Sequence, residues 1–173
     1  MRKGFTYVVS MVVVAGLASL AAADEWKPYT STAGRYSASF PGTPKEVTQR
    51  METEIGGIDA TIASLESNNA FFAIAYNDYP REKMGNLTPD QLLDNARKGA
   101  VDKVKGKLVS EKKVTASGYP GRELQIEAPG GLHITEHVYL VKTRLYQILV
   151  VTPSAGANSD DVKKFLDSFK FQP

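Results

Sequence analysis

The sequence predicts an α+β domain built on an antiparallel β-sheet of about seven or eight strands that is covered by helices. Short runs of apolar and β-branched residues recur between turn-forming residues, a pattern typical of strands joined by tight connections. Two other segments have helical periodicity behind a capping residue. The runs Phe71 to Ala75 and Leu145 to Val151 are almost wholly apolar, which indicates central strands buried on both faces. Helices must therefore cover at least part of the sheet.

The first 23 residues predict a secretory signal peptide. Arg2 and Lys3 precede an apolar run from Phe5 to Leu20, and small alanines then lead to Asp24. We expect cleavage before Asp24 and export to the periplasm or the extracellular medium, with no stable membrane insertion afterwards. Retention of the run as a membrane anchor is the alternative, because it approaches the roughly 20 residues that a spanning helix needs.

Residues 24–173 predict a single domain of 173 − 23 = 150 residues. Without Arg2 and Lys3 the basic residues fall from 21 to 19, which equals the 19 acidic residues. This formal neutrality predicts no general attraction to nucleic acid. The chain has no cysteine, so its stability must come from the core, and thiol catalysis and thiolate metal sites are excluded.

Four strands are expected in the first half of the domain. The segments between them are rich in Gly, Pro and Asn, which suit tight turns. Loops this short connect antiparallel strands, because a parallel connection needs a long crossover. The expected strands are Tyr36 to Phe40, Lys45 to Thr53, Ile58 to Ser67 and Ala70 to Tyr79.

A helix, four more strands and a last helix are expected after these. In the first helix Thr88 is the N-cap, Pro89 is the first helical residue, Gln91 completes a capping box and Gly106 is the stop. The last helix begins after Ser159, and its apolar residues share one face. The strands between them are Lys107 to Thr115, Arg122 to Ala128, Leu132 to Val141 and Leu145 to Pro153.

Both histidines of the chain lie in the stretch His133-Ile134-Thr135-Glu136-His137, which matches the H-x-x-E-H motif of inverted zincin peptidases. A shared zinc ion requires a helix, because residues four apart on a strand are separated by about 13 Å. The β-branched residues and the preceding Pro129-Gly130-Gly131 turn favour a strand. We therefore predict no zinc site, and we predict no cofactor and no catalytic residue.

A basic segment is the candidate partner-binding site. It could contact an acidic protein surface or anionic lipid heads. The alternative is a solvated helix end whose lysines complement the helix dipole. The candidate residues are Arg97, Lys98, Lys103, Lys105 and Lys107.

Three stretches resemble exported bacterial proteins of the PsbP-like group, which includes DcrB and shares its fold with the Ran-binding protein Mog. They are GRYSASFPGTPKE, GYPGRELQIE, and RLYQILVVTP leading to FLDSFKF, and the resemblance spans most of residues 34–171. It implies an antiparallel sheet sandwiched by helices, no common catalytic residues and a role in binding partners. Fold alone implies no function.

The resulting interpretation is an exported, non-catalytic accessory domain that binds another envelope protein. The alternative is a periplasmic carrier or sensor of a small ligand or metal. A hydrolase that uses carboxylates from distant strands is the third possibility.

Overall fold

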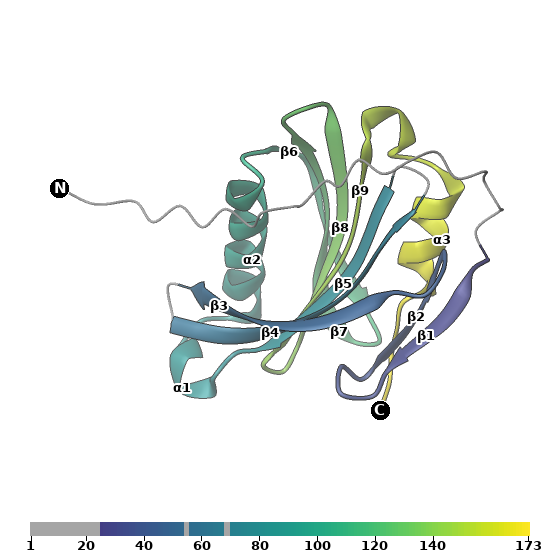
Figure 1. The fold of residues 1–173 in the computed structure, drawn as a ribbon. Coiled ribbons are helices and arrows are strands. Elements are labelled where there is room, and N and C mark those ends of the chain that lie inside the picture. Colours follow the sequence, from purple (N-terminus) through teal and green to yellow (C-terminus); the bar gives the residue numbers. More distant parts are fainter. Residues whose placement is uncertain (1–24, 54–55, 68–69) are drawn as a thin grey trace.

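A computed structural model describes residues 25–53, 56–67 and 70–173. In this part of the chain a seven-stranded antiparallel sheet runs in the order β3-β4-β5-β9-β8-β7-β6, and a smaller sheet runs in the order β1-β2-β10. Figure 1 shows α2 on one side of the large sheet and α3 on the other. The α+β class and the helix-covered antiparallel sheet are confirmed. The expected signal peptide, residues 1–23, lies outside the described residues.

The large sheet is formed by seven of the eight expected strands, with ends that differ from the expected ones by at most three residues. Every neighbouring pair is antiparallel. The strands are β3 (Lys45–Thr53), β4 (Gly56–Ser67), β5 (Ala70–Asp78), β6 (Lys107–Ala116), β7 (Tyr119–Ala128), β8 (Leu132–Val141) and β9 (Arg144–Pro153).

The eighth expected strand, β2 (Tyr36–Phe40), belongs to the small sheet instead. Its partners are β1 (Lys27–Ser31) and β10 (Lys170–Phe171), neither of which the sequence predicts as a strand. The pairing of Lys170 with Ser37 joins the two ends of the domain. This small sheet closes over the same face of the large sheet as α3.

The first long helix, α2 (Pro89–Lys103), begins as expected. The Thr88 hydroxyl accepts from the Gln91 amide, and the Gln91 side chain accepts from the Thr88 amide, so the capping box is formed. The helix ends slightly before the expected stop, because Lys105 already adopts a left-handed backbone with φ of 51°. Two short helices, α1 (Arg81–Met84) and the 3-10 turn η1 (Ser154–Gly156), were not expected.

Two apolar cores lie on opposite faces of the large sheet. The α2 core lies between α2 and strands β7, β8 and β9, and it includes Leu92, Leu93, Leu124, Ile126, Ile134, Val138 and Leu145. The α3 core lies between the other face and α3 (Asp160–Ser168) with β2, and it includes Tyr36, Phe40, Phe72, Ile74, Ile148, Val150 and Phe165. Strand β9 contributes to both cores, which explains its almost unbroken apolar sequence.

Helix α3 is held by aromatic contacts. Phe165 is fully buried, and its ring centroid lies 5.0 Å from that of Phe40 and 5.2 Å from that of Phe72. The Ser159 hydroxyl accepts from the Val162 amide, as the sequence predicts for the N-cap. Within the described ranges, no helix is both long and apolar enough to cross a membrane.

Candidate functional site

The structure places the predicted basic residues around the C-terminal end of α2 and the start of β6. Lys98 and Lys103 are exposed on α2, Lys105 is exposed in the connection, and Lys107 is the exposed first residue of β6. At about 3.6 residues per turn, Lys98 and Lys103 lie about 140° apart around the helix axis. The lysines therefore surround one end of the helix and do not share one helix face. Among the described residues, none of the four forms an ion pair.

Arg97 is in a different situation from these lysines. Its side chain is 31% exposed, and its Nη1 lies 2.7 Å from Glu111 Oε2 and 3.7 Å from Asp94 Oδ1. Arg97 thus connects α2 to β6 across the sheet edge. Arg97 forms ion pairs within the domain, whereas the four lysines form none among the described residues.

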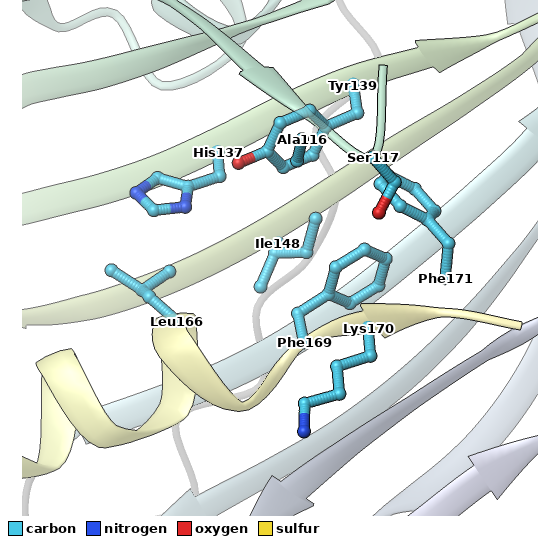
Figure 2. A pocket seen from close by; sticks show the side chains of 9 residues that line it. All are labelled: Ala116, Ser117, His137, Tyr139, Ile148, Leu166, Phe169, Lys170 and Phe171. Carbon is cyan, nitrogen blue, oxygen red and sulfur yellow. The ribbon is translucent and has the colours of Figure 1, made fainter. Parts of the chain in front are cut away.

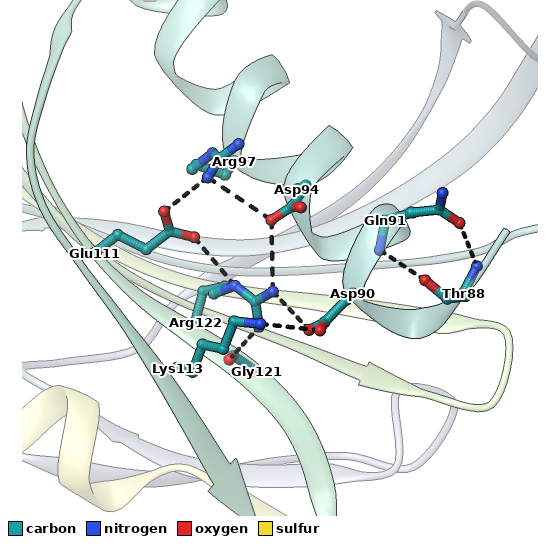
Figure 3. Close-up of polar contacts among 9 residues, drawn as sticks. All are labelled: Thr88, Asp90, Gln91, Asp94, Arg97, Glu111, Lys113, Gly121 and Arg122. Atoms are coloured by element: carbon teal, nitrogen blue, oxygen red, sulfur yellow. Dashed lines mark hydrogen bonds and ion pairs between the residues drawn. The ribbon is translucent and has the colours of Figure 1, made fainter.

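A buried arginine forms the centre of this charge network. The Arg122 side chain on β7 is only 2% exposed, and Figure 3 shows it beneath the N-terminal half of α2. Its Nη2 donates to Asp90 Oδ1 at 2.7 Å and to Asp94 Oδ1 at 3.5 Å, and its Nε donates to Glu111 Oε1 at 3.1 Å. Its Nη1 donates to the Gly121 carbonyl at 3.1 Å. The network attaches α2 to β6 and β7.

The chemistry of this network is charge neutralisation. Hydrogen bonds from Arg122 and from Lys113, whose Nζ lies 2.9 Å from Asp90 Oδ2, hold the pKa of the Asp90 carboxyl below its ordinary value. A general acid needs the opposite shift, so that it keeps its proton near neutral pH. These carboxylates have the properties of structural ion-pair partners.

The H-x-x-E-H stretch is a strand, as predicted, and forms most of β8. Glu136 points toward α2, on the side of Ile134 and Val138, while His133 and His137 point to the opposite face of the sheet. The carboxylate and the imidazoles are therefore separated by the sheet. Within the described residues, no three His, Asp or Glu side chains are grouped to hold a metal ion.

Glu136 is a fully buried carboxyl group under α2. It is 2% exposed, and Oε1 accepts a hydrogen bond of 2.8 Å from Gln147 Nε2. Burial raises its pKa from 4.5 to about 7, and the hydrogen bond and the charge of Lys103 oppose this rise only in part. The sequence contains the signal for this position, because Glu136 shares strand parity with Ile134 and Val138, so a strand must place its carboxyl group on their apolar face.

The two histidines each contact a polar neighbour on β7. His133 Nε2 is hydrogen-bonded to Gln125 Oε1, which also accepts from Thr135 Oγ1 at 3.1 Å. His137 Nε2 lies 3.8 Å from Glu123 Oε1. Burial lowers the pKa of His137 and Glu123 opposes that effect, so burial favours the neutral imidazole. Each histidine is thus accommodated by cross-strand contacts.

A pocket of about 290 Å³ lies next to His137. Figure 2 shows it between the β6–β7 turn, strands β8 and β9, and the segment that links α3 to β10. Its walls include the rings of Tyr139, Phe169 and Phe171, and its polar groups include His137 and the Ser117 hydroxyl. The pocket is lined by aromatic rings and polar groups in similar measure, and its volume lies just below the range that is usual for small-ligand sites.

A larger hollow of about 640 Å³ lies beside it, around Arg144. The Arg144 guanidinium binds both Asp78 oxygens at 2.7 Å and donates to the Ala33 carbonyl at 2.8 Å. The Tyr146 hydroxyl donates to the Gly34 carbonyl at 2.7 Å. These groups fasten the β1–β2 turn to the large sheet.

The comparison with solved structures supports the fold. No protein-family model and no curated protein matches the chain. The solution structure of cyanobacterial PsbP (CyanoP) from Synechocystis sp. PCC 6803 superimposes with a TM-score of 0.59, covering 91% of this chain and 98% of that one. The sequences are 13% identical. The chain therefore has a PsbP-like fold, as the sequence resemblance implied.

Proposed function

We propose that this chain is an exported, non-catalytic accessory domain that binds a partner protein through the basic end of α2. The observation that carries the proposal is the contrast in that region between paired and unpaired cations. Arg97, Lys113 and Arg122 are neutralised by carboxylates of the domain itself. Lys98, Lys103, Lys105 and Lys107, defined here as the lysine cluster, are exposed and lack such partners within the described chain.

Two observations support an accessory role. The first is the PsbP-like fold, and the second is that the polar clusters of the described residues do not have the arrangement of a catalytic site. The carboxylates around Arg122 neutralise that arginine, and the histidines are separated from Glu136 by the sheet. Unpaired lysines around a helix end favour an acidic partner and a fast, salt-dependent association. The partner expected from this chemistry is an envelope protein with an acidic surface.

A pull-down from native envelope extract tests the proposal. The tagged protein, produced from the full chain, is compared with a variant in which the lysine cluster is changed to glutamine. The control variant changes four exposed lysines elsewhere, Lys27, Lys83, Lys163 and Lys170, so that both variants lose the same charge. We expect a stoichiometric partner that dissociates at high salt, is lost from the cluster variant and is retained by the control.

Two outcomes would contradict the proposal. A partner that binds both variants equally and is insensitive to salt would place the interface elsewhere on the domain. Equal loss in both variants would indicate a general effect of net charge. Circular dichroism of each variant excludes loss of folding as the cause.

Binding of a small ligand is the second candidate function, and the pocket beside His137 is the observation that favours it. A ligand suited to this site would combine an aromatic or other apolar part with polar groups that bond to the His137 imidazole or the Ser117 hydroxyl. Native mass spectrometry of protein purified without detergent should then show a bound small molecule. Ser117→Trp, at the rim of the pocket, should remove that molecule, while Ser154→Trp, on an exposed turn away from the pocket, should not.

A further inference from the structure

The two edges of the seven-stranded sheet differ in how they are protected against pairing with another strand. The β6 edge has a register shift between Leu108 and Ser110 and bears Lys107, Lys112 and Lys113. A bulge and several lysines are the devices by which proteins block edge pairing. The β3 edge lacks a register shift, because Lys45–Thr53 pairs with β4 without interruption.

The β3 edge is also accessible. Residues 45–50 are all exposed, and Val47 is one of three large apolar side chains that are exposed in the described chain, with 50% of its surface accessible. Across the strand pair, the hydroxyls of Thr48 and Thr61 lie 2.8 Å apart, the close approach typical of a non-hydrogen-bonded pair. Glu46, Thr48 and Arg50 therefore direct their backbone N–H and C=O groups toward the free side.

The charges along this edge complement a second copy of the same edge. In an antiparallel pair centred on Thr48, Glu46 of each copy lies opposite Arg50 of the other, which gives two opposite-charge pairs. On the other face, the two Val47 side chains come into diagonal contact. A pair centred one residue later, on Gln49, would instead place Glu46 opposite Glu52 of the second copy. The alternation of charge thus selects one register.

Existing contacts leave room for this pairing. The Tyr29 and Ser31 hydroxyls both donate to Oε2 of Glu46, so the bonds that fix this carboxylate use only one of its two oxygens. The Arg50 side chain is 64% exposed; its Nη1 donates to Asp59 Oδ1 at 3.3 Å and its Nη2 donates to the Gly57 carbonyl at 3.4 Å. A guanidinium has five N–H donors in a fork that can bind more than one acceptor at a time.

We propose that β3 is a self-association edge: two copies of this chain pair through β3 in an antiparallel register centred on Thr48, so that their large sheets become continuous. This interface lies apart from the lysine cluster, and the two proposals can fail separately. The pairing supplies backbone hydrogen bonds to an edge that otherwise turns its N–H and C=O groups to solvent.

Single-cysteine cross-linking tests the register, because the chain has no cysteine of its own. In Thr48→Cys the two sulfurs of a dimer meet at the two-fold axis, where Cα atoms about 5.5 Å apart allow a disulfide. Val109→Cys is the matched control, because Val109 is equally exposed, at 51%, on the opposite edge. We expect mild oxidation to cross-link Thr48→Cys at least about tenfold faster than Val109→Cys. Equal rates would overturn the proposal.

Sedimentation velocity of the cysteine-free protein, up to about 100 µM, measures the association itself. Thr48→Pro removes an outward N–H without removing a bond to β4, and Arg50→Glu places like charges opposite each other. We expect both to weaken the dimer at least about tenfold, and the charge-swapped double variant Glu46→Arg/Arg50→Glu to recover it. Circular dichroism confirms folding of each variant.

Besides equal cross-linking rates, three further results would overturn this proposal. The first is a protein that stays monomeric over the whole concentration range. The second is a dimer that is unaffected by Thr48→Pro and Arg50→Glu, since it would use another surface. The third is Thr48→Cys cross-linked in cells to a different protein in place of a second copy, since the edge would then serve another partner.

Discussion

The buried carboxyl group of Glu136 predicts an unusual dependence of stability on pH. Its pKa is about 7 in the folded protein and 4.5 when it is exposed, so the folded state keeps a proton that the unfolded state has lost between these values. The free energy of unfolding therefore falls as pH rises through this window, by about 1.4 kcal/mol per pH unit for this group. The shift of roughly 2.5 pH units corresponds to about 3 kcal/mol in total.

Glu136→Gln removes the titration while keeping the shape of the side chain. At about pH 4.5 the wild-type carboxyl is still protonated in the folded state. The free energies of unfolding of the two proteins should then differ only through the changed hydrogen bonds of the amide. Above about pH 7 the wild type must hold a carboxylate in an apolar core. The free energy of unfolding of the variant, relative to that of the wild type, should therefore be up to about 3 kcal/mol higher than at about pH 4.5. The informative quantity is this change in the difference with pH.

Urea denaturation at several pH values from about 4.5 to 8.5 provides the measurement. The fluorescence of Trp26, the only tryptophan, follows unfolding, because its ring packs 6.2 Å from that of Phe72. Glu66→Gln, at an exposed position on β4, is the control and should give a difference that does not change with pH. A constant difference for Glu136→Gln as well would refute the reasoning and show that nearby positive charge, such as that of Lys103, keeps the buried group ionised.

Substitutions at three further positions test the Arg122 network, the α3 core and the cap of α2. Arg122→Met should lower the free energy of unfolding by about 2 kcal/mol, less than the 3–5 typical of a broken buried pair, because the carboxylates it leaves are partly exposed; an unchanged urea midpoint would mean that the network adds nothing. Phe165→Ala should cost about 3–5 kcal/mol in the same assay through the cavity it leaves; a cost below about 1 would show that the α3 core closes over the gap. Thr88→Ala should lower the free energy of unfolding by about 1 kcal/mol through the lost cap, whereas Thr88→Ser, which keeps a capping hydroxyl, should lower it much less.

Local sequence signals were sufficient for most of the fold. Strand β8 and helix α2 were predictable because alternation, turn residues and a capping box all act within a few residues of one another. Strands β1 and β10 were not predictable in this way. Their short segments become strands only by pairing with β2, and for β10 that partner lies more than 130 residues away along the chain.

The candidate site was less predictable for the same physical reason. The basic segment was visible as composition, but the sequence could not separate Arg97 from the lysines, because its partner Glu111 is on the next strand. The burial of Arg122, in contrast, has a signal in the sequence. This residue shares strand parity with Leu124 and Ile126, so a β7 strand must place its charge on the apolar face.

The placement of the two helices on opposite faces has a consequence for the order in which the domain opens. The α2 core protects β7, the α3 core protects β5, and β8 and β9 contribute to both. Detachment of either helix would therefore leave the central strands covered on one side. The backbone amides of β8 and β9 are expected to exchange with solvent only on global unfolding, whereas those of β3 and β6 exchange through local opening. The domain is in this sense two cooperative units that share a common pair of strands.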